Sequence, residues 1–367
     1  MGHMNSTNCE LSIIMAAYNA ESYILEAIRS IRSQSFQKYQ LIVVDDGSTD
    51  GTAEIIGSQA AIDGRITAIN NINNVGLASS LNIGLDFATG DLVARLDADD
   101  VALKDRLSRQ IECFRKNNNL VICGSNVVFT THDLTPIFPT RLPLDDWSIR
   151  THFMFMNPFI HSTVMVKGDI FRSIGFRYNE NYEAAQDYEM WSRILYEGQA
   201  MNLEAPLVYS RRHAGTVSTT NKIKQIHYSS VVQTEYTKIF FISSGVEHSK
   251  AQVLLSGCSN RKNGTQFTLG CVGSCIGALN IVDELEKRCG IEKMEAVRRY
   301  IVMVSVKIAV LSLLKKDGIK LLFRILGNEQ EAIRRGIKIF LARSPGNYVL
   351  GGFKGLVYSI FPTHLNR

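Results

Sequence analysis

The sequence lacks the motifs that identify several common enzyme classes. No Gly-x-Gly-x-x-Gly follows the first apolar run at residues 11–17, so the phosphate-binding glycines of a Rossmann dehydrogenase are absent. Neither a Walker lysine motif nor a Gly-x-Ser-x-Gly elbow occurs, which argues against P-loop nucleotidases and α/β-hydrolases. The apolar stretch 301–314 contains only one charge, Lys307, but it is shorter than the roughly 20 residues that span a bilayer.

Cysteine is scarce and follows no recognisable pattern. The seven cysteines are an odd, scattered set, and the spacing of Cys271 and Cys275 fits one helix face as well as a metal site. No paired His or second close Cys pair completes a zinc pattern, so we expect reduced cytosolic thiols. No signal peptide opens the chain, and residues 1–4 resemble a cloning remnant.

Basic character is concentrated in the C-terminal tail. The 367 residues, 45% hydrophobic and 20% charged, are enough for one large α/β domain and a second helical module. Residues 300–367 hold 11 Lys/Arg against 3 Asp/Glu, a balance of +8, so the first 299 residues carry −3 of the net +5. We therefore expect any anionic partner surface to bind the tail.

Apolar runs and helical patterns alternate through the first 100 residues. We expect strands at 11–17, 41–44, 66–69 and 92–96, with helices that include 21–33 and 77–88. This alternation predicts a parallel, doubly wound sheet, in which ligands bind beyond the carboxyl ends of the strands. The acidic turns at Asp45 and Asp97 both fall on that edge. Further along, we expect strands at 121–129 and 163–166 and a helix at 187–197, and a mobile loop at 257–273.

The segment 96–100, Leu-Asp-Ala-Asp-Asp, carries the most informative chemistry. Ionised carboxylates repel one another and are costly to desolvate, so strand interiors avoid such clusters. At the carboxyl end of a buried strand, the cluster is suited to a divalent cation or a bound sugar. The alternative is a polar turn that caps a helix beginning near Leu103.

Five motifs occur in the order of a known family: Ser12–Asn19, Val43–Thr52, Asn74–Ala78, Ala88–Asp91 and Leu96–Asp100. A further match is Gln186–Trp191. The series resembles the family 2 glycosyltransferases, and the resemblance covers about residues 11–218. It implies an α/β GT-A fold, a doubly wound, Rossmann-like mixed sheet that binds a nucleotide-diphospho-sugar. We expect this domain at 9–220 and a helical, basic, membrane-associated module at 221–367.

The resemblance implies a site for the donor nucleotide formed by Ala17, Tyr18, Asn19, Asp46, Gly76, Asp97 and Arg211. Tyr18 would stack on the base, a contact that contributes about 1–3 kcal/mol, although it is alternatively a core or rim tyrosine. Asp46 would accept a hydrogen bond from a uracil-type N–H, which favours uridine donors. Ser48, Thr49 or Asp50 in the same turn would cap the following helix.

The resemblance also implies a metal site and a catalytic base. Asp99, Asp100 and His213 would hold Mn²⁺ or Mg²⁺ beside the two phosphates, whose developing charge must be stabilised as they leave. A lone histidine such as His213 is otherwise more often structural. Asp187 would take the proton of the acceptor hydroxyl, and Gln186 replaces the first member of the usual acidic pair. The alternative for Asp187 is a helix N-cap.

We expect the acceptor side of the site to include His161, Glu189 and Trp191. The predicted reaction is an inverting, metal-dependent transfer from a UDP-sugar to a lipid-linked saccharide, as in O-antigen or capsule assembly. Basic amphipathic segments at 319–325 and 334–343 favour peripheral contact with the cytoplasmic face of the membrane over a solvated helical bundle, and we expect no nucleic-acid partner. The alternatives are a catalytically silent nucleotide- or carbohydrate-binding protein and a sugar-nucleotide pyrophosphorylase.

Overall fold

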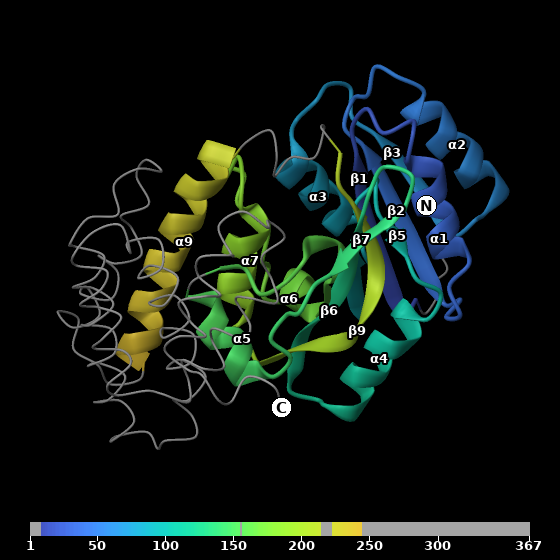
Figure 1. Cartoon of the computed structure of the whole chain (residues 1–367). Coiled ribbons are helices and arrows are strands. Elements are labelled where there is room, and N and C mark those ends of the chain that lie inside the picture. The colour runs from blue at the N-terminus through green and yellow to red at the C-terminus, as the bar shows by residue number, and fades with distance from the viewer. Residues whose placement is uncertain (1–8, 155, 214–221, 244–367) are drawn as a thin grey trace, which may run out of the picture. The chain divides into compact units, whose positions relative to one another are not determined.

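The computed structural model describes residues 9–154, 156–213 and 222–243 (Figure 1). The chain divides into two compact units, residues 1–239 and 240–367. Nearly all described residues belong to the first unit. The expected loop at 257–273, the apolar stretch 301–314 and the basic segments 319–325 and 334–343 lie outside the described residues.

The first unit begins with alternating strands and helices, as the sequence predicts. Their order is β1 (Leu11–Ala17), α1 (Ile24–Arg32), β2 (Tyr39–Asp45), α2 (Thr52–Ile62), β3 (Ile66–Asn70), α3 (Leu77–Asp86) and β4 (Leu92–Arg95). β1 pairs in parallel with β2 on one side and β4 on the other, and β3 pairs in parallel with β2. The predicted doubly wound parallel arrangement is therefore confirmed for these strands.

The second half of this unit makes the sheet mixed. It comprises β5 (Val101–Ala102), α4 (Arg106–Lys116), β6 (Leu120–Thr130), β7 (Pro136–Pro139), α5 (Asp146–Phe153), the 3₁₀ turn η1 (His161–Thr163), β8 (Met165–Lys167), α6 (Asp169–Arg172), α7 (Gln186–Ile194), β9 (Gln199–Arg211) and α9 (Lys222–Ser243). The strand order is β3-β2-β1-β4-β8-β6-β9-β5, with β7 beside β6. β8 runs antiparallel to β4 and β6, whereas β6 and β9 are parallel. The structure confirms the expected mixed α/β sheet.

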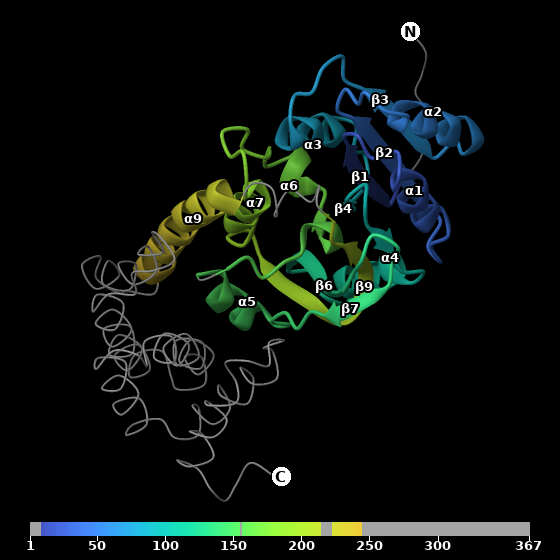
Figure 2. The ribbon, with the colours of Figure 1, turned by 45° about the horizontal axis from the view of Figure 1, so that its top comes forward.

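Both faces of the first strands are covered by helices. All seven residues of β1 are buried, which explains its continuous apolar run because a doubly covered parallel strand has no solvent face. Figure 2 shows α1 and α2 on one side of these strands and α3 on the other. α3 can approach β1 closely because Gly84 has no side chain: a Cβ at this position would lie 2.6 Å from Cγ2 of Ile14. The helices leave the carboxyl edge of the sheet as the place for a site.

Within the first unit, α9 packs through aromatic rings on α5 and on the segments that flank α7. The Tyr236 ring lies 4.4 Å from that of Phe153 and 5.9 Å from that of Tyr196, centroid to centroid. Near the other end of the helix, Tyr228 lies 5.1 Å from Tyr182. The expected domain boundary at residue 220 stays a prediction. Among the described helices, none combines the length and the apolar character needed to cross a membrane.

Candidate functional site

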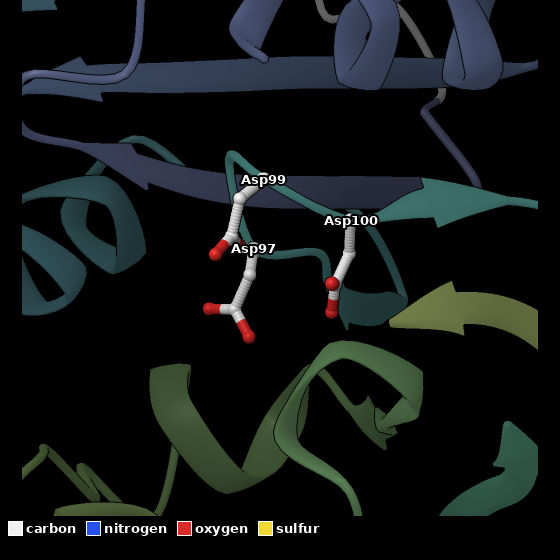
Figure 3. A group of neighbouring side chains, drawn as sticks. All are labelled: Asp97, Asp99 and Asp100. Carbon is white, nitrogen blue, oxygen red and sulfur yellow. The ribbon is translucent and has the colours of Figure 1, made fainter. Parts of the chain in front are cut away.

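Three carboxylates lie together just beyond the end of β4. Asp97, Asp99 and Asp100 each offer an oxygen, and these oxygens lie within 4.8 Å of one another (Figure 3). The chain continues directly into β5, and α4 begins only at Arg106, with no side chain capping it. Helix capping, the alternative explanation for this cluster, is therefore not what the structure shows.

Asp97 is held from two directions. Its carboxylate pairs with the buried Arg95 and accepts a hydrogen bond from the Ser162 hydroxyl at 2.6 Å. The Ser162 oxygen in turn accepts from the backbone N–H of Asp97 at 3.0 Å. These bonds hold residues 161–163 in a 3₁₀ turn, so the strand expected at 163–166 begins only at Met165.

The other two carboxylates connect the cluster to the end of β9. Oδ2 of Asp99 lies 2.9 Å from Nε2 of His213, and the His213 ring stacks on Tyr23 of the turn before α1 with a centroid distance of 4.9 Å. Oδ1 of Asp100 accepts from the backbone N–H of Arg211 at 2.9 Å. Of the three predicted metal-binding residues, the structure thus places Asp99 and Asp100 in one cluster with Asp97, and His213 contacts this cluster through Asp99.

The electrostatics of the cluster favour a bound cation. Burial raises the pKa of Asp99, and the nearby charge of Asp97 adds to this effect. Burial likewise raises the pKa of Asp100 well above its usual value, with Asp99 and Asp97 contributing. At Asp97, burial opposes ionisation, but the charges of Arg95 and Arg106 and the hydrogen bond from Ser162 together outweigh it, and the pKa is lowered. A divalent cation would relieve this repulsion, and carboxylate oxygens are its preferred ligands.

Arg211 uses its guanidinium within the protein. Nη1 donates to the carbonyl of Asp99 at 2.6 Å, Nε donates to the carbonyl of His132 at 3.0 Å, and Nη2 pairs with Glu26. The side chain is only 2% exposed. The predicted phosphate contact of Arg211 does not fit this conformation, because all three guanidinium nitrogens already have protein partners. In the structure, Arg211 links β9 to α1 and to the acidic cluster.

The expected nucleotide side of the site lies where β1 and β2 end. Tyr18 is 49% exposed directly after β1, which leaves its ring open to a ligand and excludes the core alternative. The carbonyl of Ala17 accepts from the backbone N–H of Asp46 at 2.8 Å. Asn19 has a φ of +47°, and its side-chain oxygen accepts from the backbone N–H of Thr49 at 2.9 Å. These bonds hold the two strand ends together beneath the exposed ring.

Asp46 organises the loop before α3. Its carboxylate accepts from the Asn71 side chain and from the backbone N–H groups of Val75 and Gly76, each at 2.9 Å. Gly76 has a φ of +91°, a conformation that L residues rarely adopt. A carboxylate has about four acceptor positions, so the three donors occupy most of them. The contact of Asp46 with a uracil N–H stays a prediction, whereas its role in shaping the Gly76 loop is observed.

Asp187 lies in the first turn of α7, close to the acidic cluster. Its Oδ2 accepts from Nδ2 of Asn157 at 2.8 Å. Burial raises the pKa of Asp187 to about 6, and the negative charge of Asp97 adds to this shift. The residue before α7's first turn, Ala185, has a φ of +58°, which marks a strained entry into the helix. A carboxylate with a pKa near neutrality suits a general base.

Two of the expected acceptor-side residues are engaged in the protein. Glu189 forms a bidentate ion pair with Arg193, with both N–O distances 2.8 Å. Trp191 is 1% exposed, and its ring packs against Phe159, His161 and Tyr178. Trp191 therefore belongs to the core, so the prediction that it contacts an acceptor does not agree with the structure. The bidentate pair gives Glu189 a structural partner in place of an acceptor.

His161 stays near the site in neutral form. Its Nε2 lies 3.0 Å from the Tyr178 hydroxyl. Burial lowers the pKa of His161 to about 3, and the Arg95 charge lowers it further. The His161 ring packs against that of Trp191 on α7 at a centroid distance of 5.9 Å, and the next residue, Ser162, donates to Asp97, so the imidazole lies near both α7 and the acidic cluster.

Several residues of the site were missed by the sequence analysis. Arg95 is a charged residue at the end of an otherwise apolar strand, and that anomaly was the available signal. Ser162 follows His161 and Asn157 lies four positions before it, but nothing in the local pattern tells which partners their side chains find. Their contacts with Asp97 and Asp187 join residues 65 and 30 positions apart. Only the fold reveals such pairs.

Comparisons with known proteins show the family and the fold to which this chain is similar. The family model described as glycosyl transferase family 2 matches residues 12–178. An uncharacterized glycosyltransferase of Haemophilus influenzae is 30% identical over 249 residues, which cover 65% of this chain and 77% of the relative. The Escherichia coli UDP-Glc:alpha-D-GlcNAc-diphosphoundecaprenol beta-1,3-glucosyltransferase WfaP is 32% identical over 227 residues, 61% of this chain and 86% of WfaP. The crystal structure of S. aureus TarS 1–349 in complex with UDP-GlcNAc has a similar fold, with a TM-score of 0.54 and 16% sequence identity. The match covers 89% of this chain and 92% of the TarS chain.

Proposed function

Because the chain belongs to the family 2 glycosyltransferases, we propose that it moves a sugar from a UDP-sugar to a hydroxyl of a saccharide acceptor, with inversion at the anomeric carbon. The observation that carries this proposal is the proximity of two acidic elements far apart in the chain. The charge of Asp97, at the end of β4, contributes to the raised pKa of Asp187 on α7. The reaction needs a site for the diphosphate and a catalytic base close to each other, because both act on the same anomeric carbon.

The proposed donor site combines the exposed ring of Tyr18 with the strand-end loops of Asn19 and Gly76 and with Asp97. Stacking on the exposed ring would hold the base, and the backbone bonds described above would keep the loops in place. WfaP, which uses UDP-Glc by its name, supports a uridine donor.

The donor set of the acidic cluster fits a divalent cation. Asp99, Asp100 and His213 offer two carboxylates and an imidazole, and the carboxylate oxygens are near enough to share one ion. Mn²⁺ or Mg²⁺ bound there would stabilise the negative charge that develops on the departing diphosphate. The protein's own part is to hold these ligands through Arg211, Tyr23 and Ser162 before the donor arrives.

Asp187 is the proposed catalytic base. As the acceptor oxygen forms its bond to the anomeric carbon, the bond from that carbon to the diphosphate oxygen breaks on the opposite face. The hydroxyl proton passes to the Asp187 carboxylate, so charge and atoms balance. The base is weak toward a free alcohol, but the hydroxyl becomes more acidic as its new bond forms, and a pKa of about 6 strengthens the base.

The proposed acceptor is a lipid-linked saccharide in bacterial surface polysaccharide assembly, at the cytoplasmic face of the membrane. Support comes from WfaP, whose name gives a diphosphoundecaprenol-linked acceptor. The +8 charge of residues 300–367 is a second argument, since each Lys or Arg near an anionic surface contributes about 1 kcal/mol. We propose this tail as the part that meets the lipid.

A transfer assay tests the function directly. Purified protein is incubated with UDP- and GDP-sugars, Mn²⁺ and undecaprenyl-diphosphate-linked GlcNAc, and release of the nucleotide is measured with and without acceptor. We expect acceptor-dependent release of UDP by the parental chain and none by Asp187→Asn, which should still bind UDP. UDP binding without any transfer would instead identify a silent binding protein, and sugar-nucleotide formation from UTP and a sugar phosphate would identify a pyrophosphorylase.

A further inference from the structure

The proposed base receives a hydrogen bond from a residue outside the family motifs quoted above. Asn157 lies in the segment between α5 and η1, 30 positions before Asp187. Its Nδ2 donates to Oδ2 of Asp187 at 2.8 Å, a distance typical of charge-assisted hydrogen bonds. The contact joins a loop to the first turn of α7.

The amide of Asn157 can point only one way. Its Oδ1 accepts from the backbone N–H of Phe159 at 3.1 Å, and a backbone N–H can only donate. The NH₂ group must therefore face the opposite side, where the acceptor-only carboxylate of ionised Asp187 lies. The Phe159 N–H and the Asp187 carboxylate thus require the same orientation of the Asn157 amide. The local turn therefore fixes the NH₂ group toward the base.

The loop that carries Asn157 is anchored to the sheet. Pro158 restricts the backbone of the residue before it, and the Pro158 carbonyl accepts from Nδ2 of Asn202 on β9 at 3.0 Å. Phe159 is 2% exposed. Gly124 on β6 makes room for both neighbours, because a Cβ there would lie 2.2 Å from Oδ1 of Asn202 and 2.9 Å from the Phe159 ring. Asn157 thus extends from a rigid support.

We propose that Asn157 is a positioning residue for the base: its amide fixes the direction of the Asp187 carboxylate toward the acceptor and favours the ionised form that accepts the proton. This inference rests on the function proposed above. A free carboxylate at a helix start can rotate, whereas one held at Oδ2 presents its remaining lone pairs in a set direction. Small errors in such directions cost large factors in rate.

The charges around Asp187 define the expected pH effect. Asp97 raises the pKa of Asp187, while hydrogen bonds from the Tyr188 backbone and from Asn157 lower it. Burial raises the pKa of Tyr178 and keeps its hydroxyl neutral across the working range, and the charge of Asp187 adds to this effect. Loss of the Asn157 donor therefore raises the pKa of Asp187 above about 6, and the acid limb of the rate profile moves to higher pH.

Two substitutions of Asn157 distinguish its hydrogen bond to Asp187 from its hydrogen bond within the local turn. Asn157→Ala removes both hydrogen bonds, whereas Asn157→Asp keeps an acceptor for the Phe159 N–H and replaces the donor with a negative charge. For both, we expect kcat to fall by about 10- to 100-fold, since a hydrogen bond to a charged group is lost, with the KM for the UDP-sugar unchanged. The acid limb of the pH profile of kcat should move to higher pH by at least about half a unit, and by more in Asn157→Asp.

Asn117 offers a matched control. Its Oδ1 accepts from the backbone N–H two residues on, that of Asn119, at 3.0 Å, and its Nδ2 donates to the Gln199 side chain at 2.8 Å. Asn117→Ala removes the same pair of bonds away from Asp187, so kcat and its pH profile should not change. Melting curves of all three variants identify any loss of folded protein, and rates are expressed per folded molecule.

The outcomes separate this inference from the function on which it rests. If Asp187→Asn is inactive while both Asn157 variants keep the parental kcat and acid limb, the positioning role is overturned and the proposed function stands. The Asn157 variants could also show a lower kcat while the acid limb of their pH profile stays where it is in Asn117→Ala. That result would identify Asn157 as a merely structural residue and would also overturn the positioning role. If Asp187→Asn transfers sugar at the parental rate, the base assignment fails, and the inference fails with it.

Discussion

Replacing Asp187 with Asn should make the protein more stable while it abolishes transfer. Burial raises the pKa of Asp187 to about 6 in the folded chain, whereas an unfolded aspartate titrates near 3.9. Ionising this carboxylate is therefore harder in the folded state, and the penalty is fully present above about pH 6. It disappears below about pH 3.9, where both states are protonated. Asparagine cannot ionise, and its side-chain oxygen can still accept from Asn157.

The size of the stability gain follows from the same shift. Since one pKa unit is equivalent to about 1.4 kcal/mol, the difference between about 6 and roughly 3.9 sets an upper value of about 3 kcal/mol at pH 7.5. Partial exposure of the side chain allows solvent to screen the charge, so we expect a gain of about 1–3 kcal/mol. At pH 5 the gain should be about half as large. The loss of a general base should lower kcat by about 10²- to 10⁴-fold.

Urea unfolding at pH 7.5 and pH 5.0 measures the free energy of unfolding of both proteins, and calorimetry measures their affinity for UDP. Asp86→Asn is the matched control, because Asp86 is a surface residue paired with Arg177 across 2.9 Å and should change stability by less than about 0.5 kcal/mol. An Asp187→Asn variant that is less stable than the parent at both pH values would refute the argument from burial. Parental activity in that variant would refute the assignment of the base.

Three further substitutions test the donor site, the metal site and the fold. Tyr18→Ala should weaken UDP binding by about 5- to 150-fold while Tyr18→Phe retains it, as measured by calorimetry; equal affinities would exclude stacking. Asp99→Asn removes a charge from the cluster beside His213, so the Mn²⁺ concentration for half-maximal activity should rise at least about tenfold, and an unchanged requirement would contradict the ligand assignment. Gly47→Ala places a Cβ 2.6 Å from the Asn73 carbonyl carbon at a φ of +69°, so the free energy of unfolding should fall by about 1–3 kcal/mol in urea, and parental stability would show that the loop adapts.

The sequence predicted well the elements whose pattern is local. β1 was predicted at residues 11–17 and is observed there, because a strand buried on both faces must be apolar throughout. The α1 helix was expected at 21–33 and spans 24–32, since the end of a helix depends on capping contacts that periodicity does not show. The strand expected at 163–166 begins only at Met165, because the bonds that hold the preceding turn η1 involve Asp97, 65 positions away, and no local pattern shows them.

For the site, the sequence alone determined which residue types were available: a run of carboxylates after a buried strand, an aromatic residue after β1 and an acid at the start of α7. These follow from local pattern and from the resemblance they carry. Only the tertiary structure decided their partners. It turned Arg211 inward to Glu26, buried Trp191 in the core and placed Asn157 against Asp187. Such contacts join residues from distant parts of the chain, so the packing of the whole sheet, and no local preference, determines them.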